Sequence, residues 1–145
     1  MVDTDVRRER GPASRLLAPE WTGDAAVLGL RLAVGVVMAY HGWLRLEQGG
    51  MSGFAGFLES LGVPASELMA YVVTYLELIG GIALIVGLAT RYVAALFVVQ
   101  MIFTNILVKF DVGLIAPEGG VGAELDILIL AIALALALMG AGRWS

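Results

Sequence analysis

The sequence of 145 residues contains no cysteine, a single histidine and few charges, and each shortage excludes a class of protein. Without cysteine the chain cannot form a disulfide, hold an iron–sulfur cluster or carry out thiol chemistry of its own. One histidine cannot supply a two-histidine haem site or a histidine-based zinc site, so we expect neither metal nor haem on this chain alone. A net charge of −4 and the lack of a basic stripe argue against nucleic acid as a partner.

Only 15% of the residues are charged, whereas 59% are hydrophobic. A typical soluble domain has about 25% charged and 45–50% apolar residues. The surplus of apolar side chains must therefore face something other than water. We interpret the chain as a membrane protein whose principal partner is the lipid bilayer.

The apolar residues are gathered in four segments that are each long enough to cross a bilayer. They cover residues 25–44, 67–88, 91–110 and 123–141. A helix of about 20 residues spans some 30 Å of hydrocarbon, and no segment alternates as a membrane β-strand would. The sequence predicts an all-α fold: a bundle of four transmembrane helices formed by residues 25–145, preceded by a polar tail of residues 1–24.

The arginine and lysine residues that flank the spans predict the orientation of the bundle. On the side of both termini they are Arg7, Arg8, Arg10, Arg15, Arg91 and Arg143, and on the opposite side they are Arg45 and Lys109. Because basic residues are enriched in cytoplasmic flanks, we expect both termini in the cytoplasm.

The loop between the first two spans has helical periodicity of its own. Its apolar positions are Met51, Phe54, Leu58 and Leu61. Ser52 is a suitable N-cap, and Gly62 with Pro64 would end the segment. This pattern predicts a short amphipathic helix on the outer membrane surface, or a lid over the end of the bundle.

Two charged residues, Arg31 and Glu77, lie well inside the apolar spans. Glu77 is in the middle of its span, where a lone carboxylate would be protonated or paired. The nominal depth of Arg31 differs from that of Glu77 by only about 4.5 Å, within reach of a long side chain. Two interpretations stay open: a buried Arg31–Glu77 ion pair that fixes helix packing, and a functional role in proton relay or substrate anchoring.

The histidine, His41, lies near the outer end of the first span in the motif YHGW at residues 40–43. Histidine at this depth is suited to hydrogen bonding a carbonyl and exchanging protons near neutral pH. The alternative is an interfacial residue within an aromatic belt. Other polar residues are expected at the same end of the bundle. Together they suggest a polar pocket, whereas each alone is typical of a helix-end anchor. They are Arg45, Asn105, Lys109, Glu124 and Asp126.

Glycines flatten the helix surfaces near Glu77. Gly80 and Gly81 follow it, and Gly29 and Gly35 lie in the first span. Small residues of this kind usually allow close helix packing, but the same space suits a flat planar ligand. We therefore include Gly80 and Gly81 as candidate cofactor-binding residues, together with His41, Asn105 and Lys109.

Several motifs resemble the DoxX family of small prokaryotic membrane proteins. They are at residues 31–42, 53–64, 76–81 (LELIGG), 86–91 (VGLATR) and 140–145 (GAGRWS), so that the resemblance runs from about residue 28 to the C-terminus. It implies a four-helix bundle in a prokaryotic plasma membrane. The residues that match the recurring polar positions of the family are Arg31, His41, Glu77 and Arg91.

The resemblance also implies an association with redox chemistry at the membrane. Relatives include a subunit of a thiosulfate:quinone oxidoreductase, and others are linked to oxidative-stress complexes with superoxide dismutase and a sulfurtransferase. Three functions are compatible with the sequence. In the first, the chain is a quinone-interacting subunit of a membrane oxidoreductase. His41 would then hydrogen bond a quinone carbonyl, Glu77 held by Arg31 would relay protons, and electrons would come from thiosulfate or a partner protein.

The second function is a non-catalytic anchor or scaffold, often a homo-oligomer, that recruits a soluble redox enzyme. The third is a small transporter subunit, although no inverted repeat or broken helix is evident. Binding of a quinone near His41 and Glu77 would separate the first function from the second.

Overall fold

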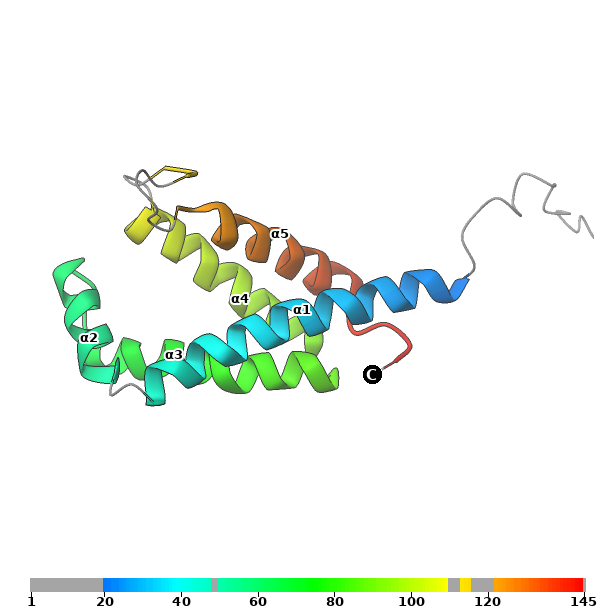
Figure 1. Cartoon of the computed structure of the whole chain (residues 1–145), viewed down its shortest axis with the longest axis horizontal. Coiled ribbons are helices and arrows are strands. Elements are labelled where there is room, and N and C mark those ends of the chain that lie inside the picture. Colours follow the sequence, from blue (N-terminus) through cyan, green and yellow to red (C-terminus); the bar gives the residue numbers. More distant parts are fainter. Residues whose placement is uncertain (1–19, 48–49, 110–112, 116–121, 145) are drawn as a thin grey trace, which may run out of the picture.

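The computed structural model describes residues 20–47, 50–109, 113–115 and 122–144, and all regular structure in these residues is helical (Figure 1). The elements are α1 (Glu20–Glu47), α2 (Gly50–Ser60), α3 (Ser66–Val86), α4 (Thr90–Thr104), the π-helical turn η2 (Asn105–Lys109) and α5 (Glu124–Met139). The predicted all-α fold is confirmed. The first helix begins at residue 20 and so includes the last residues of the expected tail, while residues 1–19 lie outside the described part.

Three of the described helical segments are long and apolar enough to cross a membrane, namely Trp21–Glu47, Ser66–Val86 and Thr90–Lys109. The 16 residues of α5 are strongly apolar, but they extend only about 24 Å, less than the roughly 30 Å of a hydrocarbon core. The fourth span therefore stays a prediction. Many large apolar side chains are exposed on the outside of the bundle, as at Ile79 and Leu138, which suits a surface that faces lipid.

The chain turns from α3 into α4 within three residues. Gly87 adopts a φ of 83°, and its N–H donates to the carbonyl of Leu84 while that of Leu88 donates to Ala83. This pattern of bonds is a Schellman motif, which requires a residue in the left-handed region and therefore favours glycine. The turn brings the start of α4 next to the end of α3.

A helix is present where the sequence predicts the short outer one. This helix, α2, ends at Ser60 and is followed by a turn at Gly62, which has a φ of 75°. The N–H groups of Gly62 and Val63 donate to the carbonyls of Glu59 and Leu58. The predicted end is confirmed, whereas Ser52 lies inside α2 instead of at its N-cap. Because no membrane bounds the structure, the place of α2 on the outer surface stays a prediction.

The antiparallel helices α1 and α3 pack closely along a seam of glycines. A Cβ atom on Gly81 would lie 2.4 Å from the backbone nitrogen of Ala39, and one on Gly42 would lie 2.6 Å from that of Leu78. Such distances leave no room for a side chain, so that the two backbones approach directly. Gly81 therefore serves helix contact and leaves no flat surface for a ligand.

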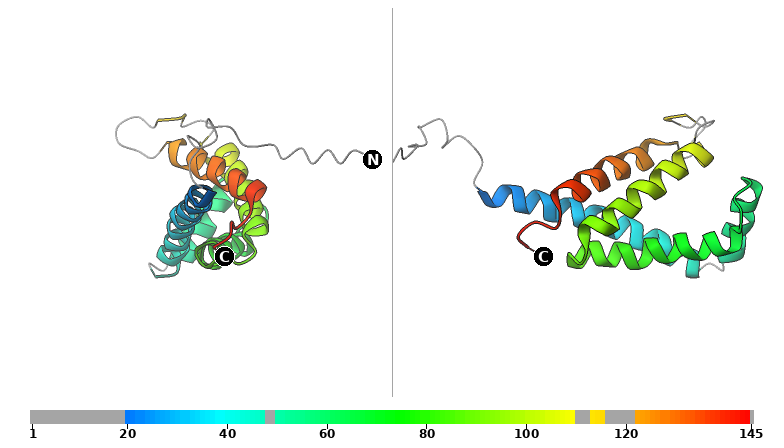
Figure 2. Two further views of the ribbon diagram at one scale, coloured as in Figure 1. Left: turned by 90° about the vertical axis from the view of Figure 1, so that its right-hand side faces the viewer. Right: turned by 180° about the vertical axis from the view of Figure 1, so that it is seen from behind.

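The helices form two pairs, α1 with α3 and α4 with α5 (Figure 1). The short turn predicts that α3 and α4 are packed neighbours, but they diverge from the turn, as Figure 2 shows. The fully buried ring of Phe97 packs against Gly80 near this turn and joins the pairs. Other buried core residues include Val34, Met38 and Leu136.

The bundle has two ends with different contents. The start of α1, the α3–α4 turn and the C-terminal segment lie at one end, which we call the termini end (Figure 1). The end of α1, helix α2, the turn η2 and the start of α5 lie at the other, which we call the loop end. Each end contains one arginine of α1 that contacts other helices.

Candidate functional site

Arg31, at the termini end, is 1% exposed and binds backbone carbonyls. Its Nε donates to Leu84 at 3.0 Å and its Nη2 to Ile85 at 3.2 Å. Its Nη1 donates to Ala141 at 2.7 Å and to Trp144 at 3.1 Å. The first two carbonyls belong to the last turn of α3, where a cation is favourable because of the helix dipole. Arg31 thus fastens the C-terminal segment to α3.

A second contact holds the same segment. The backbone N–H of Arg143 donates to Asp24 at 3.1 Å, so that α1 contacts the segment from two positions. Both contacts connect the C-terminal segment to helices, and neither Arg31 nor Asp24 lines a cavity that we describe below. We therefore interpret Arg31 as a structural residue that connects helices and the C-terminal segment.

The ion pair between Arg31 and Glu77, one of the two interpretations that the sequence left open, does not form. Side chains on a helix lean toward its N-terminus, and α1 and α3 run in opposite directions. Arg31 therefore points to the termini end, whereas Glu77 points to the loop end. Similar nominal depth along the membrane normal was not sufficient to bring the two groups together.

Glu77 is instead partnered by Arg45 and Gln100. It is 3% exposed, its Oε2 is paired with Nη1 of Arg45, and its Oε1 accepts a hydrogen bond from Nε2 of Gln100. A buried carboxylate is stable only where a charge and hydrogen bonds compensate its lost hydration. Glu77 is thus paired, as expected at this depth, but by Arg45 of α1 and Gln100 of α4 instead of Arg31.

Arg45 also contacts α2. Its guanidinium carbon lies 4.2 Å from the centroid of the Phe54 ring, a cation–π geometry, and its side chain is 25% exposed. Helix α2 is in this way connected to the buried carboxylate of α3. A change in the Arg45–Glu77 pair would therefore alter the contact between Arg45 and α2.

A cavity of about 80 Å³ lies beside Glu77, between the two helix pairs. Its polar lining consists of His41, Arg45, Glu77, Gln100, Thr104 and Asp126, and its apolar lining of Met38, Met101, Leu125 and Ile129. Residues from α1, α3, α4 and α5 thus meet here. The polar pocket that the sequence suggests at the loop end is present, although with a different set of residues.

His41 lies at the mouth of this cavity, since it lines the cavity and is also exposed. Its Nδ1 is 2.8 Å from the backbone oxygen of Val37. A carbonyl oxygen only accepts hydrogen bonds, so that Nδ1 carries a proton, and Nε2 of the neutral ring is an acceptor. Nε2 is therefore the ring nitrogen of His41 that does not contact Val37.

The other candidate cofactor-binding residues do not line this cavity. Gly81 faces the backbone of α1, and Gly80 faces the ring of Phe97. Asn105 donates its Nδ2 to the carbonyl of Met101, one turn back on its own helix, at 2.8 Å. Lys109 lies beyond it in η2. Of the candidate catalytic and cofactor-binding residues, His41 and Glu77 line the cavity, together with Arg45 and Asp126 from the expected polar pocket.

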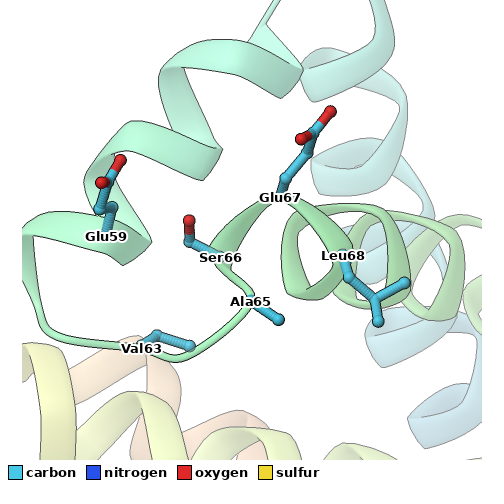
Figure 3. A pocket seen from close by; sticks show the side chains of 6 residues that line it. All are labelled: Glu59, Val63, Ala65, Ser66, Glu67 and Leu68. Atoms are coloured by element: carbon cyan, nitrogen blue, oxygen red, sulfur yellow. The ribbon is translucent and has the colours of Figure 1, made fainter.

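A second, larger hollow of about 450 Å³ lies on the surface where α2 meets α3 (Figure 3). It is lined by Glu59, Val63, Ala65, Ser66, Glu67 and Leu68. None of these six residues is buried, so that water screens their charges and the hollow has little to bind a ligand with. Within the described ranges, no three His, Cys, Asp or Glu residues are grouped so that they could hold a metal ion.

Comparison with known proteins places the chain in a family. The model of the DoxX family matches residues 26–109, which is more than half of the chain. The chain belongs to the DoxX family. The matched region runs from within α1 to the end of η2 and includes Glu77 and both of its partners, but it ends before α5.

Two relatives support this assignment. "Putative oxidoreductase CatD" of Bacillus subtilis (strain 168) is 40% identical over 118 residues, which are 81% of each chain. "Uncharacterized membrane protein Rv3486" of Mycobacterium tuberculosis (strain ATCC 25618 / H37Rv) is 29% identical over 142 residues, 88% of this chain and 86% of that protein. No solved structure matches the chain. This DoxX protein is a membrane protein with a relative that is named an oxidoreductase.

Proposed function

We propose that this DoxX protein is a redox-associated membrane subunit that binds a quinone ring at the mouth of the polar cavity. The observation that carries the proposal is the placement of an exposed histidine, His41, directly beside a buried carboxylate network centred on Glu77. The similarity to CatD, whose name assigns it to the oxidoreductases, supports a redox role.

The size of the cavity determines where the ring would lie. Pockets that enclose small organic ligands usually measure about 300–1,000 Å³, whereas this cavity measures about 80 Å³. We therefore place the ring outside it, against His41 and Leu125, which both line the cavity and are exposed. The isoprenoid tail would lie in the bilayer along the exposed apolar side chains.

His41 can serve both oxidation states of such a ring through Nε2. A protonated His41 donates a hydrogen bond to a quinone carbonyl, and a neutral His41 accepts one from the hydroxyl of the reduced ring. His41 would in this way pass a proton in either direction. Glu77 and Asp126 are the carboxyl groups of the cavity with which it would exchange protons.

The electrons would have to come from another molecule, because this sequence has no cysteine and one histidine and shows no electron carrier. We propose a soluble redox enzyme as the donor, and association of the bundle with further copies of itself stays open within this proposal. The second function, a non-catalytic anchor for such an enzyme, requires no ligand at His41.

Binding of quinone analogues tests the proposal. Purified protein in lipid nanodiscs would be titrated with decylubiquinone and with menadione, and binding followed by tryptophan fluorescence. We expect His41→Ala to weaken binding about tenfold, since a hydrogen bond to a charged group contributes about 1.5 kcal/mol, and Glu77→Gln to weaken it as well. Tyr40→Phe, next to His41 on the same helix, is the matched control. Equal binding by all four proteins would overturn the site and leave the anchor function.

The proposal also places four spans in the plasma membrane with both termini in the cytoplasm. Because the chain has no cysteine, single cysteines can report on sidedness. We expect Ser60→Cys, at the end of α2, to react with a membrane-impermeant maleimide in intact cells, and Ser14→Cys in the tail to react only after lysis. The reverse pattern would invert the orientation.

A further inference from the structure

Two buried oxygens beside the cavity have no hydrogen-bond partner among the described residues. They are Oε1 of Gln100 and Oδ2 of Asp126, and both residues line the cavity. An unpartnered buried acceptor is destabilising by about 1–3 kcal/mol, and native structures rarely leave such atoms without water or another donor. Both atoms are acceptors that need a hydrogen-bond donor.

Neighbouring donors in the cavity are already engaged. The Thr104 hydroxyl donates to the backbone carbonyl of Gln100 at 3.0 Å, while the Gln100 amide nitrogen and the Arg45 guanidinium both donate to Glu77. The cavity itself provides room for a donor, since its 80 Å³ exceeds the roughly 10–15 Å³ that one water molecule needs. A few water molecules would supply hydrogen bonds to both oxygens.

The two carboxyl groups of the cavity differ in the hydrogen bonds that protonation would break. Both oxygens of Glu77 accept hydrogen bonds, from Arg45 and from Gln100, and these bonds favour the ionised form. Oδ2 of Asp126 accepts none. A proton can add to Oδ2 of Asp126 without breaking a hydrogen bond, and the resulting O–H is a donor to water in the cavity.

We propose that the cavity is a hydrated proton-binding site in which Asp126 takes up and releases the proton, and water connects Asp126 through Gln100 to the Glu77–Arg45 pair. The proton comes from water at the mouth beside His41, and no other atom is transferred. The charged or titratable groups that act on Asp126 are His41 of α1, Lys109 of η2 and Glu124 of α5, and Glu77 and Arg45 line the same cavity. The inference goes beyond the proposed redox role, because it concerns the bundle without a quinone.

Dicyclohexylcarbodiimide, an apolar reagent that modifies protonated carboxyl groups, tests the assignment. Protein in phosphatidylcholine nanodiscs would be treated over a series of pH values, and the modified residue located by mass spectrometry of peptides. We expect modification of Asp126 that falls several-fold as the pH rises, and none of Glu77. Glu124, exposed on the same helix, is the internal control for reaction at the surface. Modification of Glu77 alone, or of neither residue, would overturn the proposal.

Infrared spectroscopy tests the water. The C=O stretch of a protonated carboxyl group shifts in D₂O, because its hydrogen is replaced by deuterium. The band of Asp126 is assigned as the one that Asp126→Asn removes. We expect this band to shift rapidly in the native protein. Thr104→Leu should fill the cavity and slow exchange several-fold, while Thr104→Val, of unchanged size, should not. Equal exchange in both variants would overturn a hydrated cavity. Quinone titration of the same samples is independent, so that failure of the redox proposal can be told from failure of this one.

Discussion

Arg31 and Arg45 lie on the same helix, and the two ends of the bundle use them in opposite ways. Among the described residues, the partners of Arg31 are backbone carbonyls, those of α3 and of the C-terminal segment. Arg45 binds the side chain of Glu77 and lies over the ring of Phe54. The partners of Arg31 cannot change their charge, whereas the partner of Arg45 can lose its charge by binding a proton.

This difference separates a structural arginine from one that can take part in a response. At the termini end, no described cavity adjoins Arg31, which is 1% exposed. At the loop end, Arg45 is 25% exposed and borders a cavity with unpartnered oxygens. Substitutions at the two ends should therefore differ in their effects on stability, and four predictions test this difference.

The largest expected effect is that of Arg31→Met on stability. The variant leaves four backbone carbonyls of α3 and of the C-terminal segment without their charged donor. Because each acceptor left unsatisfied costs about 1–3 kcal/mol, we expect a total loss of about 4 kcal/mol or more. Unfolding in mixed micelles of increasing sodium dodecyl sulfate would measure the loss. Arg143→Met is the control, because Arg143 is exposed and contributes only its backbone N–H, and it should stay within about 0.5 kcal/mol of the native protein.

A similar loss in the two variants would show that the termini end does not depend on Arg31. A loss in Arg31→Met that Glu77→Gln relieved would instead restore the ion pair between Arg31 and Glu77 that the sequence suggested.

The second prediction concerns the loop end and is a double-mutant cycle. Arg45→Met leaves Glu77 buried without its cation, and we expect a loss of about 2–3 kcal/mol by the same measurement. Adding Glu77→Gln removes the unpaired charge and should recover part of this loss, with a coupling of about 1–3 kcal/mol. Additive losses would mean that the pair contributes nothing, and the contrast between the two arginines would disappear.

The third prediction concerns the glycine seam that connects the two ends. Gly81→Ala places a Cβ 2.4 Å from the backbone of α1, so that α1 and α3 must separate, at a cost of about 1–3 kcal/mol. Gly29→Ala, where no atom lies within 4 Å, should be neutral or slightly stabilising because alanine favours the helix. If Gly81→Ala were as stable as Gly29→Ala, the close contact of the two backbones would be wrong.

Hydropathy was sufficient to predict the helices and their order, since lipid-facing segments must be apolar and helical. The partners of Arg31 could not be predicted, because every residue type has a backbone carbonyl and the sequence does not show which carbonyls lack a donor. The partner of Glu77 was within reach of sequence reasoning: on antiparallel helices, the lean of side chains toward each N-terminus favours Arg45 over Arg31. A polar pocket at the loop end was suggested by the sequence, but its complete lining could not be predicted, since it depends on how four helices diverge.

The smallest expected effect marks where the loop-end site stops along α4. Asn105 was a candidate for cofactor binding, but its side chain bonds the carbonyl of Met101 on its own helix. Asn105→Ala should therefore lose one local hydrogen bond, about 0.5–1 kcal/mol. Gln100→Ala, one turn and a half earlier, removes a donor to Glu77 and should cost about 1–3 kcal/mol, because a charged buried group loses a partner. A greater loss in Asn105→Ala, measured in the same micelles, would move the site outward into η2 and away from the carboxylate of Glu77.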